Sequence, residues 1–422
     1  MAGHSEHRIG FLEFVALAAA MMSTQAIAID AMLPAFPMIA RSLHVGDENH
    51  VQWIVTAYMV GMGAGQLCWG LLSDRFGRRP VLLAGIGLYA GAALLCALTG
   101  SFHALLGARC IHGMAAASVT VSRSVIRDLF SGRQMARVMS LTFVVFLTVP
   151  ILAPSLGQLI LAIAPWRFIF IVCAVFASAV WLWALARLPE TLHPEYRMTL
   201  TPGHIASAAR LVLGNRISIC HTLAMSVMFG SIMAYVGMVQ QIFADTFHRA
   251  SLMPGMFALC ASFMGMGAFL NSRLVERLGM RLISHTALLT FIGVTALHSL
   301  IAAVGLEQLW TFVALQAATM ACVSLSVSNF GAMALEPVGS VAGVGASVQG
   351  FISTVGGALV GAAIGRQFNG TTLPLAAGAL FCGLASLLCV LLAEQGRLFR
   401  QHHAGAAALP IDGVVIDSSG AH

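Results

Sequence analysis

The chain has little charge and no lysine. Only 9% of its 422 residues are charged, 59% are hydrophobic, and the basic residues are all arginine. Soluble domains carry about 25% charged residues, so this composition excludes a soluble globular protein. The mean hydropathy of +0.88 indicates a chain that lies largely in a lipid bilayer.

The motifs of common enzyme and metal sites are also missing. The sequence has no Walker A loop, no HExxH pair and no CxxC pair, and its nine cysteines lie in apolar runs. No polar segment is long enough to form a separate catalytic domain. We therefore expect a protein that is not an enzyme and has no metal and no cofactor, and whose energy source is not ATP.

Long apolar runs take up most of the chain. A helix needs about 20 apolar residues to cross a bilayer, and that length predicts twelve spans. In the first half they are expected at residues 10–37, 51–72, 80–99, 103–125, 137–161 and 166–187. In the second half they are expected at residues 217–241, 252–272, 282–303, 308–330, 342–366 and 372–394.

A short charged motif occurs twice. Gly70, Asp74, Arg75, Gly77, Arg78 and Arg79 form the first copy, between the second and third spans, and a weaker copy follows at residues 276–281. Its glycine, Gly279, lies 202 residues after Gly77 (279 − 77). An internal repeat of this length is typical of transporters with two similar halves. The expected fold is an all-α membrane protein with twelve transmembrane helices in two pseudo-symmetric six-helix bundles.

The same reasoning divides the chain into four parts. They are an N-terminal bundle at 1–187, a cytoplasmic linker at 188–216, a C-terminal bundle at 217–396 and a cytoplasmic tail at 397–422. Most arginines fall in gaps on the side of both termini, and only Arg41, Arg167, Arg249 and Arg366 fall near the other side. This bias predicts that both termini are cytoplasmic. The first apolar run is longer than a signal-peptide core of about 7–15 residues, so we expect it to remain as an anchor.

The first motif copy is a candidate gate. Gly70 and Gly77 bracket a tight turn, and Asp74 is expected at a helix end. There its carboxylate could pair with Arg127 or Arg133 and with the positive end of a helix in the other half. The alternative is that the arginines of the motif only anchor the topology.

This motif resembles the signature of the major facilitator superfamily. Further matches resemble its Bcr/CflA (bicyclomycin/chloramphenicol resistance) branch of drug:proton antiporters. They lie at residues 29–37, 65–67, 105–113, 122–130, 150–157, 166–167 and 188–192, with weaker matches at 271–281 and 334–337. The resemblance implies the twelve-span major facilitator fold and proton-coupled drug export.

Few ionisable residues lie inside predicted spans, where charge is costly and usually functional. Asp30 is the clearest carboxylate away from a predicted cytoplasmic end, and Arg109 is the clearest buried cation. Asp30 is about 7 residues, or about 10 Å, inside the first span, and Arg109 is about 6 residues, or about 9 Å, inside the fourth from the same face. A carboxylate whose environment alternates can load and release a proton. In the resembling family, a first-span acid and a fourth-span arginine are implicated in proton and substrate coupling, and they correspond to Asp30 and Arg109. The alternatives for Asp30 are a helix cap before Leu33 and a fixed ion pair with Arg109.

The position three residues after Arg109 departs from the resembling family. That family has glutamine where this chain has His112, on the same helix face as Arg109. Imidazole titrates near neutral pH, so His112 could join the proton path. The alternative is a neutral, hydrogen-bonding replacement for the amide.

The fifth span contains Pro150, Pro154 and Gly157. Proline inside a helix removes a backbone hydrogen bond and favours a bend. The resemblance implies that this segment corresponds to the helix-bending motif of antiporters. The alternative is ordinary membrane-helix composition, since proline and glycine are common there.

These features favour a multidrug efflux protein of a bacterial inner membrane. We expect small lipophilic or amphipathic antibiotics to bind in a central cavity, and protonation of Asp30 to reset the carrier. The expected partners are the drug, protons and the lipid bilayer, with no nucleic acid, and the protein is expected to be a monomer. The alternatives are a proton-coupled symporter or metabolite exporter of the same fold, and a membrane sensor that does not transport.

Overall fold

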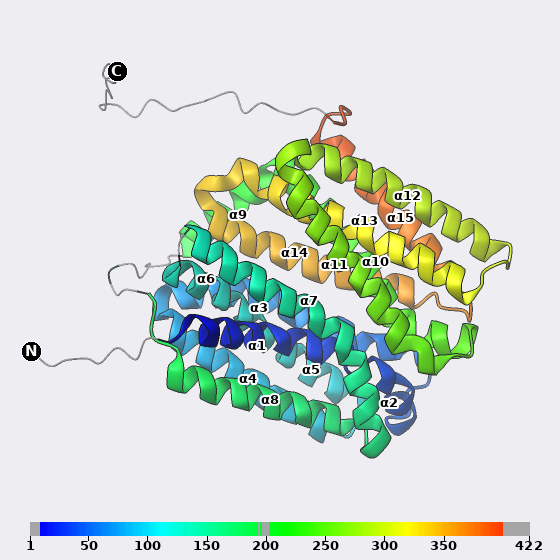
Figure 1. The fold of residues 1–422 in the computed structure, drawn as a ribbon, viewed down its shortest axis with the longest axis horizontal. Coiled ribbons are helices and arrows are strands. Elements are labelled where there is room, and N and C mark those ends of the chain that lie inside the picture. The colour runs from blue at the N-terminus through cyan, green and yellow to red at the C-terminus, as the bar shows by residue number, and fades with distance from the viewer. Residues whose placement is uncertain (1–8, 131, 193–194, 196–201, 400–422) are drawn as a thin grey trace, which may run out of the picture.

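The computed structural model describes residues 9–130, 132–192, 195 and 202–399, and the regular structure in these residues is helical. The helices run roughly side by side, and those of the first half group apart from those of the second (Figure 1). The all-α prediction is therefore confirmed.

The helices of the first half match the first six predicted spans. They are α1 (Phe11–Asp30), α2 (Phe36–Ser42), α3 (Trp53–Phe76), α4 (Arg78–Leu98), α5 (Phe102–Ala116), α6 (Thr120–Leu129), α7 (Gly132–Ile163) and α8 (Arg167–Arg187). Two of these spans are interrupted. The first breaks after Asp30 and passes through the 3-10 turn η1 (Leu33–Ala35), because Pro34 cannot donate the backbone hydrogen bond that would continue the helix. The fourth changes to a 3-10 turn, η3 (Ala117–Val119), between α5 and α6.

The second half repeats this arrangement. Its helices are α9 (Pro202–Gly214), α10 (Arg216–Gln241), α11 (Met253–Leu278), α12 (Met280–Ala303), α13 (Leu309–Leu335), α14 (Ala342–Gly365) and α15 (Leu373–Ala393). Short helical turns follow α10 at η5 (Ile242–Thr246) and α13 at η7 (Glu336–Val341). α9 falls within the segment that the sequence indicated only as a polar linker.

The lengths of these helices suit a bilayer. Within the described residues, 11 helices are long and apolar enough to cross a membrane, and α7 adds the shorter apolar stretch Thr148–Ile163 at the position of the fifth predicted span. Large apolar side chains are exposed along the outside, including Leu98 (81%), Ile163 (84%) and Phe381 (64%). Such a surface is stable in contact with lipid rather than water.

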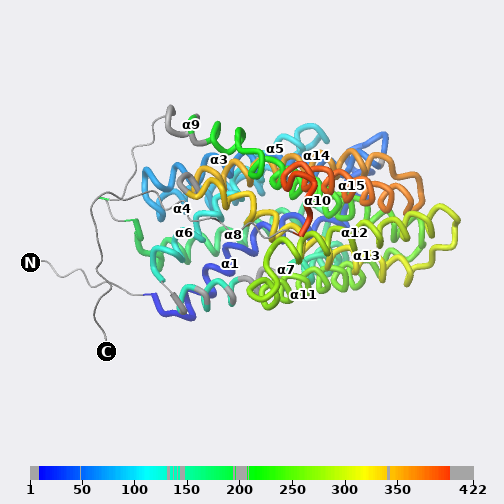
Figure 2. The backbone as a smooth tube through the Cα atoms, turned by 90° about the horizontal axis from the view of Figure 1, so that it is seen from above, coloured from blue at the N-terminus to red at the C-terminus, as the bar shows by residue number. Residues whose placement is uncertain are grey.

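Two helix pairs join the halves. α3 packs against α14, and α7 packs against α11; Figure 2 shows both pairs from above, on either side of the molecule. The Gln66 amide of α3 donates a hydrogen bond of 3.4 Å to Thr354 Oγ1 of α14. The residues near the middle of the molecule therefore lie between these two helix pairs. Any movement of one half relative to the other must change the contacts within both pairs.

Candidate functional site

Asp30 is the last residue of α1. Its side chain is buried, with 7% of its surface exposed. In the part of the chain that the structure describes, its carboxylate forms no hydrogen bond or ion pair. The C-terminal end of a helix carries partial negative charge. Asp30 lies at that end of α1, so the helix does not stabilise its carboxylate as it would at an N-terminal cap. An unpaired acid within a membrane span is costly when charged.

Arg109 is fully buried and holds three helices together. Its guanidinium donates to the Ala28 carbonyl of α1 at 3.2 Å and to the Ile54 carbonyl of α3 at 3.3 Å. It also lies 4.3 Å from the centre of the Tyr58 ring, a favourable cation–π distance. Arg109 thus reaches α1 two residues before Asp30, but among the described residues no ion pair links the two side chains. The alternative of a fixed ion pair does not describe this arrangement.

His112 hydrogen-bonds to Arg109. The distance from Arg109 Nη1 to His112 Nδ1 is 3.2 Å. Because a guanidinium can only donate, Nδ1 must be the acceptor and therefore carries no proton in this arrangement. The ring also packs against Tyr58 and Tyr89, with centroid distances of 5.4 and 4.2 Å. This geometry supports the neutral replacement for an amide, and a role in the proton path stays a prediction.

The segment with Pro150, Pro154 and Gly157 lies against the same end of α1. α7 continues as one helix through both prolines. A Cβ atom placed on Gly157 would lie 1.9 Å from the carbonyl oxygen of Ala31, so only glycine allows this approach. The structure therefore brings the proposed antiporter motif and Asp30 together, which their separation in sequence did not indicate.

The two motif copies form the same turn in the two halves. Gly77 joins α3 to α4 with φ 104° and ψ 157°, and Gly279 joins α11 to α12 with φ 78° and ψ 155°. Positive φ angles are easily adopted only by glycine. The weaker second copy thus preserves the backbone geometry of the first.

The charges of the first motif are paired within the first half. The buried Arg78 side chain bonds to Asp74, to Asp128 Oδ2 at 3.1 Å and to Ser73 Oγ at 2.8 Å. Asp74 therefore pairs with Arg78 of its own motif, and the expected pairing with Arg127 is wrong. The side chain of Arg133, the other expected partner, lies outside the described residues.

Glu190 was not predicted as a gate residue. Its carboxylate accepts hydrogen bonds from the backbone N–H of Arg78 at 2.9 Å and of Arg79 at 3.3 Å, and so caps the first turn of α4. The Arg79 side chain donates to the Leu185 carbonyl of α8 at 2.7 Å. In the sequence Glu190 lies just after the sixth span and within the family match at 188–192, but nothing there indicated a contact with the motif.

The other residues of the motif face outward or toward the second half. Arg75 is exposed and lies 5.2 Å from the centre of the Phe76 ring. A Cβ on Gly70 would lie 3.7 Å from Ser347 Oγ of α14. Gly70 is thus the motif residue that lies against the other half.

Three amides join the halves at the opposite end of α3, and we call Asn49, Gln52 and Gln241 the amide clamp. Gln52 Nε2 donates to Gln241 Oε1 at 2.8 Å and to the Gly365 carbonyl at 3.2 Å. Gln241 Nε2 donates to Asn49 Oδ1 at 2.8 Å, and Asn49 donates to the Phe368 carbonyl at 3.1 Å. Uncharged amides at span ends carry no distinctive pattern, so the sequence did not indicate this contact.

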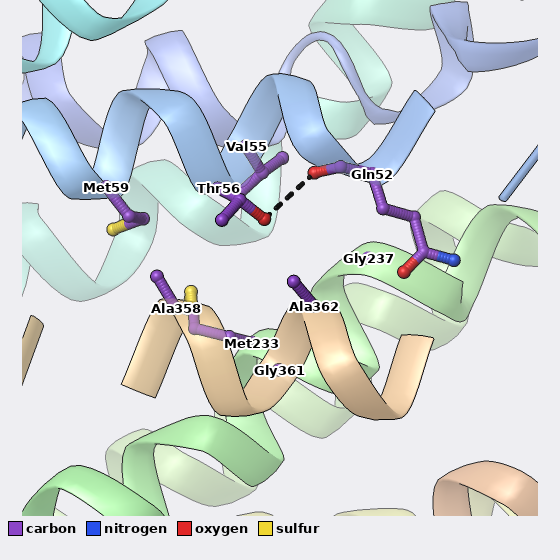
Figure 3. A pocket seen from close by; sticks show the side chains of 9 residues that line it. All are labelled: Gln52, Val55, Thr56, Met59, Met233, Gly237, Ala358, Gly361 and Ala362. Atoms are coloured by element: carbon purple, nitrogen blue, oxygen red, sulfur yellow. Dashed lines mark hydrogen bonds between the residues drawn. The ribbon is translucent and has the colours of Figure 1, made fainter. Parts of the chain in front are cut away.

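Two small cavities adjoin the amide clamp. One, of about 10 Å³, lies between Thr56 and Met59 of α3, Met233 of α10 and Ala358 of α14 (Figure 3). The other, of about 200 Å³, lies between α2 and α10, and Arg41 and Asp245 are among its lining residues. Drug-sized ligands usually occupy about 300–1,000 Å³, so neither cavity holds one unless the halves separate.

We predict that Gln52→Ala opens the clamped end. The change removes two hydrogen bonds. It leaves Gln241 Oε1 without its donor, which costs about 1–3 kcal/mol, while the Gly365 oxygen keeps the backbone N–H of Phe368 at 3.1 Å. Spin labels at the exposed positions Arg41 and Asp245, with Cys68 replaced, should report longer distances in Gln52→Ala than in the parent protein. The exposed Gln308→Ala is the control. Unchanged distances in Gln52→Ala would show that the amide clamp does not hold this end closed.

Comparison with known proteins supports the fold and identifies the protein family. A family model described as Major Facilitator Superfamily matches residues 14–362. The bicyclomycin resistance protein homolog of Haemophilus influenzae is 30% identical over 351 residues, covering 82% of this chain and 87% of that protein. The multidrug resistance protein MdtL of Klebsiella pneumoniae is 29% identical over 385 residues, covering 88% and 93%.

A solved structure shows the same fold. The xylose transporter XylE from E. coli, in a partially occluded inward open conformation, superimposes with a TM-score of 0.70 at 12% identity, covering 91% of this chain and 97% of that one. At this identity the similarity concerns the fold alone. Together with the relatives, it indicates a multi-pass membrane transporter of small molecules.

Proposed function

Because the chain belongs to the major facilitator superfamily, we propose that it exports small lipophilic or amphipathic antibiotics in exchange for protons, by alternating access. The observation that carries this proposal is the buried Asp30 carboxylate, unpaired among the described residues, at the point where α1 meets α7. The names of the relatives, bicyclomycin resistance and multidrug resistance, support the drug class.

In this proposal Asp30 is the proton carrier. Access from one side lets its carboxylate take up a proton, and access from the other side lets it release the proton. Arg109 positions the end of α1 through its bond to the Ala28 carbonyl, and His112 accepts one guanidinium N–H. Since Arg109 is held by carbonyls and aromatic rings rather than by Asp30, the carboxylate can change its charge without breaking an ion pair.

Alternating access requires both ends of the molecule to change. The amide clamp closes one end through neutral hydrogen bonds, which are weaker than ion pairs and suit a contact that must open repeatedly. The Gly77 turn lies at the other end, where Gly70 faces α14. We propose that movement of α3 against α14 and of α7 against α11 exposes the drug site.

The arginine distribution supports an orientation of this cycle in the membrane. We propose a bacterial inner-membrane location with both termini, the gate motif and α9 on the cytoplasmic side. The protein is proposed to work as a monomer, with the proton gradient as its energy source and no cofactor.

Drug accumulation in cells that overproduce the protein tests the proposal. The panel contains a chloramphenicol-type compound, a bicyclic peptide antibiotic and a lipophilic cation, each with and without an uncoupler. We expect lower accumulation of at least one compound, and loss of that difference with uncoupler. Increased accumulation would indicate import, and no change for any compound would contradict drug export.

A further inference from the structure

A cluster of charged and titratable side chains lies at one end of the second half. It contains His221 of α10, Arg281 and His285 of α12, Glu336 of η7 and Glu394 next to α15. α10 and α12 both pack against α15 there (Figure 1). The side chains of His221 and Glu394 are 0% and 2% exposed. Polar groups this deeply buried require partners.

The fixed charges of the cluster do not balance. Arg281 Nε lies 2.9 Å from Glu394 Oε1, and Arg281 Nη2 lies 3.8 Å from Glu336 Oε2. One guanidinium therefore faces two carboxylates. While both imidazoles are neutral, the cluster carries one excess negative charge.

His221 is placed to cancel that charge. Its Nδ1 lies 2.9 Å from the Ile217 carbonyl oxygen, which can only accept, so Nδ1 carries a proton. Its Nε2 lies 3.8 Å from Glu394 Oε1 and has no hydrogen-bond partner among the described residues. In the neutral ring a lone pair thus faces a carboxylate, whereas a second proton would turn the contact into an ion pair.

The other groups around His221 cannot form such an ion pair by taking up a proton. His285 Nδ1 accepts a hydrogen bond of 3.1 Å from the backbone N–H of Phe399, so protonation of that nitrogen would break an existing bond. From α13, the Phe330 ring packs against His221 at a centroid distance of 5.9 Å. The charged groups that face His221 are therefore Glu394, Arg281 and Glu336.

The first half has an ion pair between its own first and last helices. Glu13 of α1 bonds to Arg187 of α8 through two contacts of 2.6 Å, which ties the first helix of that bundle to its last. In the second half the first helix, α10, meets the end of the last, α15, through His221 and Glu394. The ion pair of the first half thus joins two fixed charges, whereas the contact between α10 and α15 includes a group, His221, whose charge depends on a proton.

We propose that His221 and Glu394 form a proton-binding site in which protonated His221 ties α10 to α15. His221 is five residues into α10, or about 8 Å along the helix, and the cluster reaches the surface at Glu336, whose side chain is 45% exposed. The site is additional to Asp30 and does not depend on antiport. It makes the packing of the second half responsive to pH at the end that carries the second motif copy.

Ring-nitrogen NMR of the full-length protein in lipid vesicles tests this site without drug or gradient. Histidine labelled with ¹⁵N reports protonation, and His221→Asn identifies the signal of His221. We expect His221 to change from the neutral Nδ1–H form to imidazolium as pH falls from 8 to 5. In Glu394→Gln the transition should move down by about one pH unit or more, because the charge that stabilises imidazolium is lost.

The control is Glu13→Gln, which removes the corresponding acid of the first half and should leave the His221 transition in place. If Glu394→Gln does not fold, Glu394→Asp serves instead, and a smaller shift in the same direction is expected. A His221 ring that stays neutral down to pH 5, or a transition unchanged by both Glu394 variants, would overturn the proposal. Because no transport is measured, neither result depends on whether the protein exports drugs.

Discussion

Asp30→Asn is expected to abolish drug efflux driven by the proton gradient, lowering it at least about tenfold. Asparagine has nearly the same shape but cannot take up and release a proton, so a cycle coupled through this residue should stop. Drug binding should remain, because the side chain volume and its burial are preserved. The measurement is drug accumulation in cells, together with drug-dependent proton movement in proteoliposomes.

Two further variants test whether the loss of efflux is due to the titratable group of Asp30. Asp245→Asn removes an exposed carboxylate from the cleft beside the amide clamp and should keep proton coupling. Asp30→Glu retains a titratable carboxyl group and should recover part of the efflux. If Asp30→Asn exports drug at the normal rate and the export still collapses with an uncoupler, Asp30 is not the coupling site.

Gly157→Ala is expected to have the second large effect. The added Cβ would lie 1.9 Å from the Ala31 carbonyl oxygen, so the end of α1 or α7 must move. Overpacking of this kind costs about 1–3 kcal/mol, and the displaced residue is the immediate neighbour of Asp30. We expect a lower thermal unfolding temperature in detergent and a loss of efflux comparable to that of Asp30→Asn.

The matched control for this change is Gly91→Ala. A Cβ at Gly91 of α4 meets no atom within 4 Å, and alanine favours helix by up to about 1 kcal/mol, so stability and efflux should be retained or slightly improved. Equal unfolding temperature and equal efflux for Gly157→Ala and the parent protein would show that the contact between α7 and α1 is not needed.

Most of the fold could be predicted because it depends on periodic, local properties. Spans were recognised from length and hydropathy, since lipid requires each helix to satisfy its own backbone hydrogen bonds. The paired turns at Gly77 and Gly279 followed from the repeated motif. The helix α9 was not predicted, because a short helix at 202–214 lacks the long apolar run that identifies a span.

The candidate site was only partly predictable. Asp30, Arg109 and His112 could be singled out, because ionisable groups in spans are rare. Their contacts could not, since a guanidinium can bind a carbonyl, a ring or an acid, and the sequence does not show which of these lies within its reach. The partner of Asp74 was wrong for the same reason, and Glu190 and the amide clamp were missed because single polar residues at span ends are common.

By itself, the sequence determined the membrane class, the twelve spans, the two related halves and the few residues whose burial demands explanation. These follow from composition and spacing, which act along the chain. Only the tertiary structure decided that Gly157 lies against the end of α1, that Arg109 bonds to carbonyls and not to Asp30, and that His221 faces Glu394. Each of these depends on which helix faces meet, and that is set by close packing between segments far apart in the sequence.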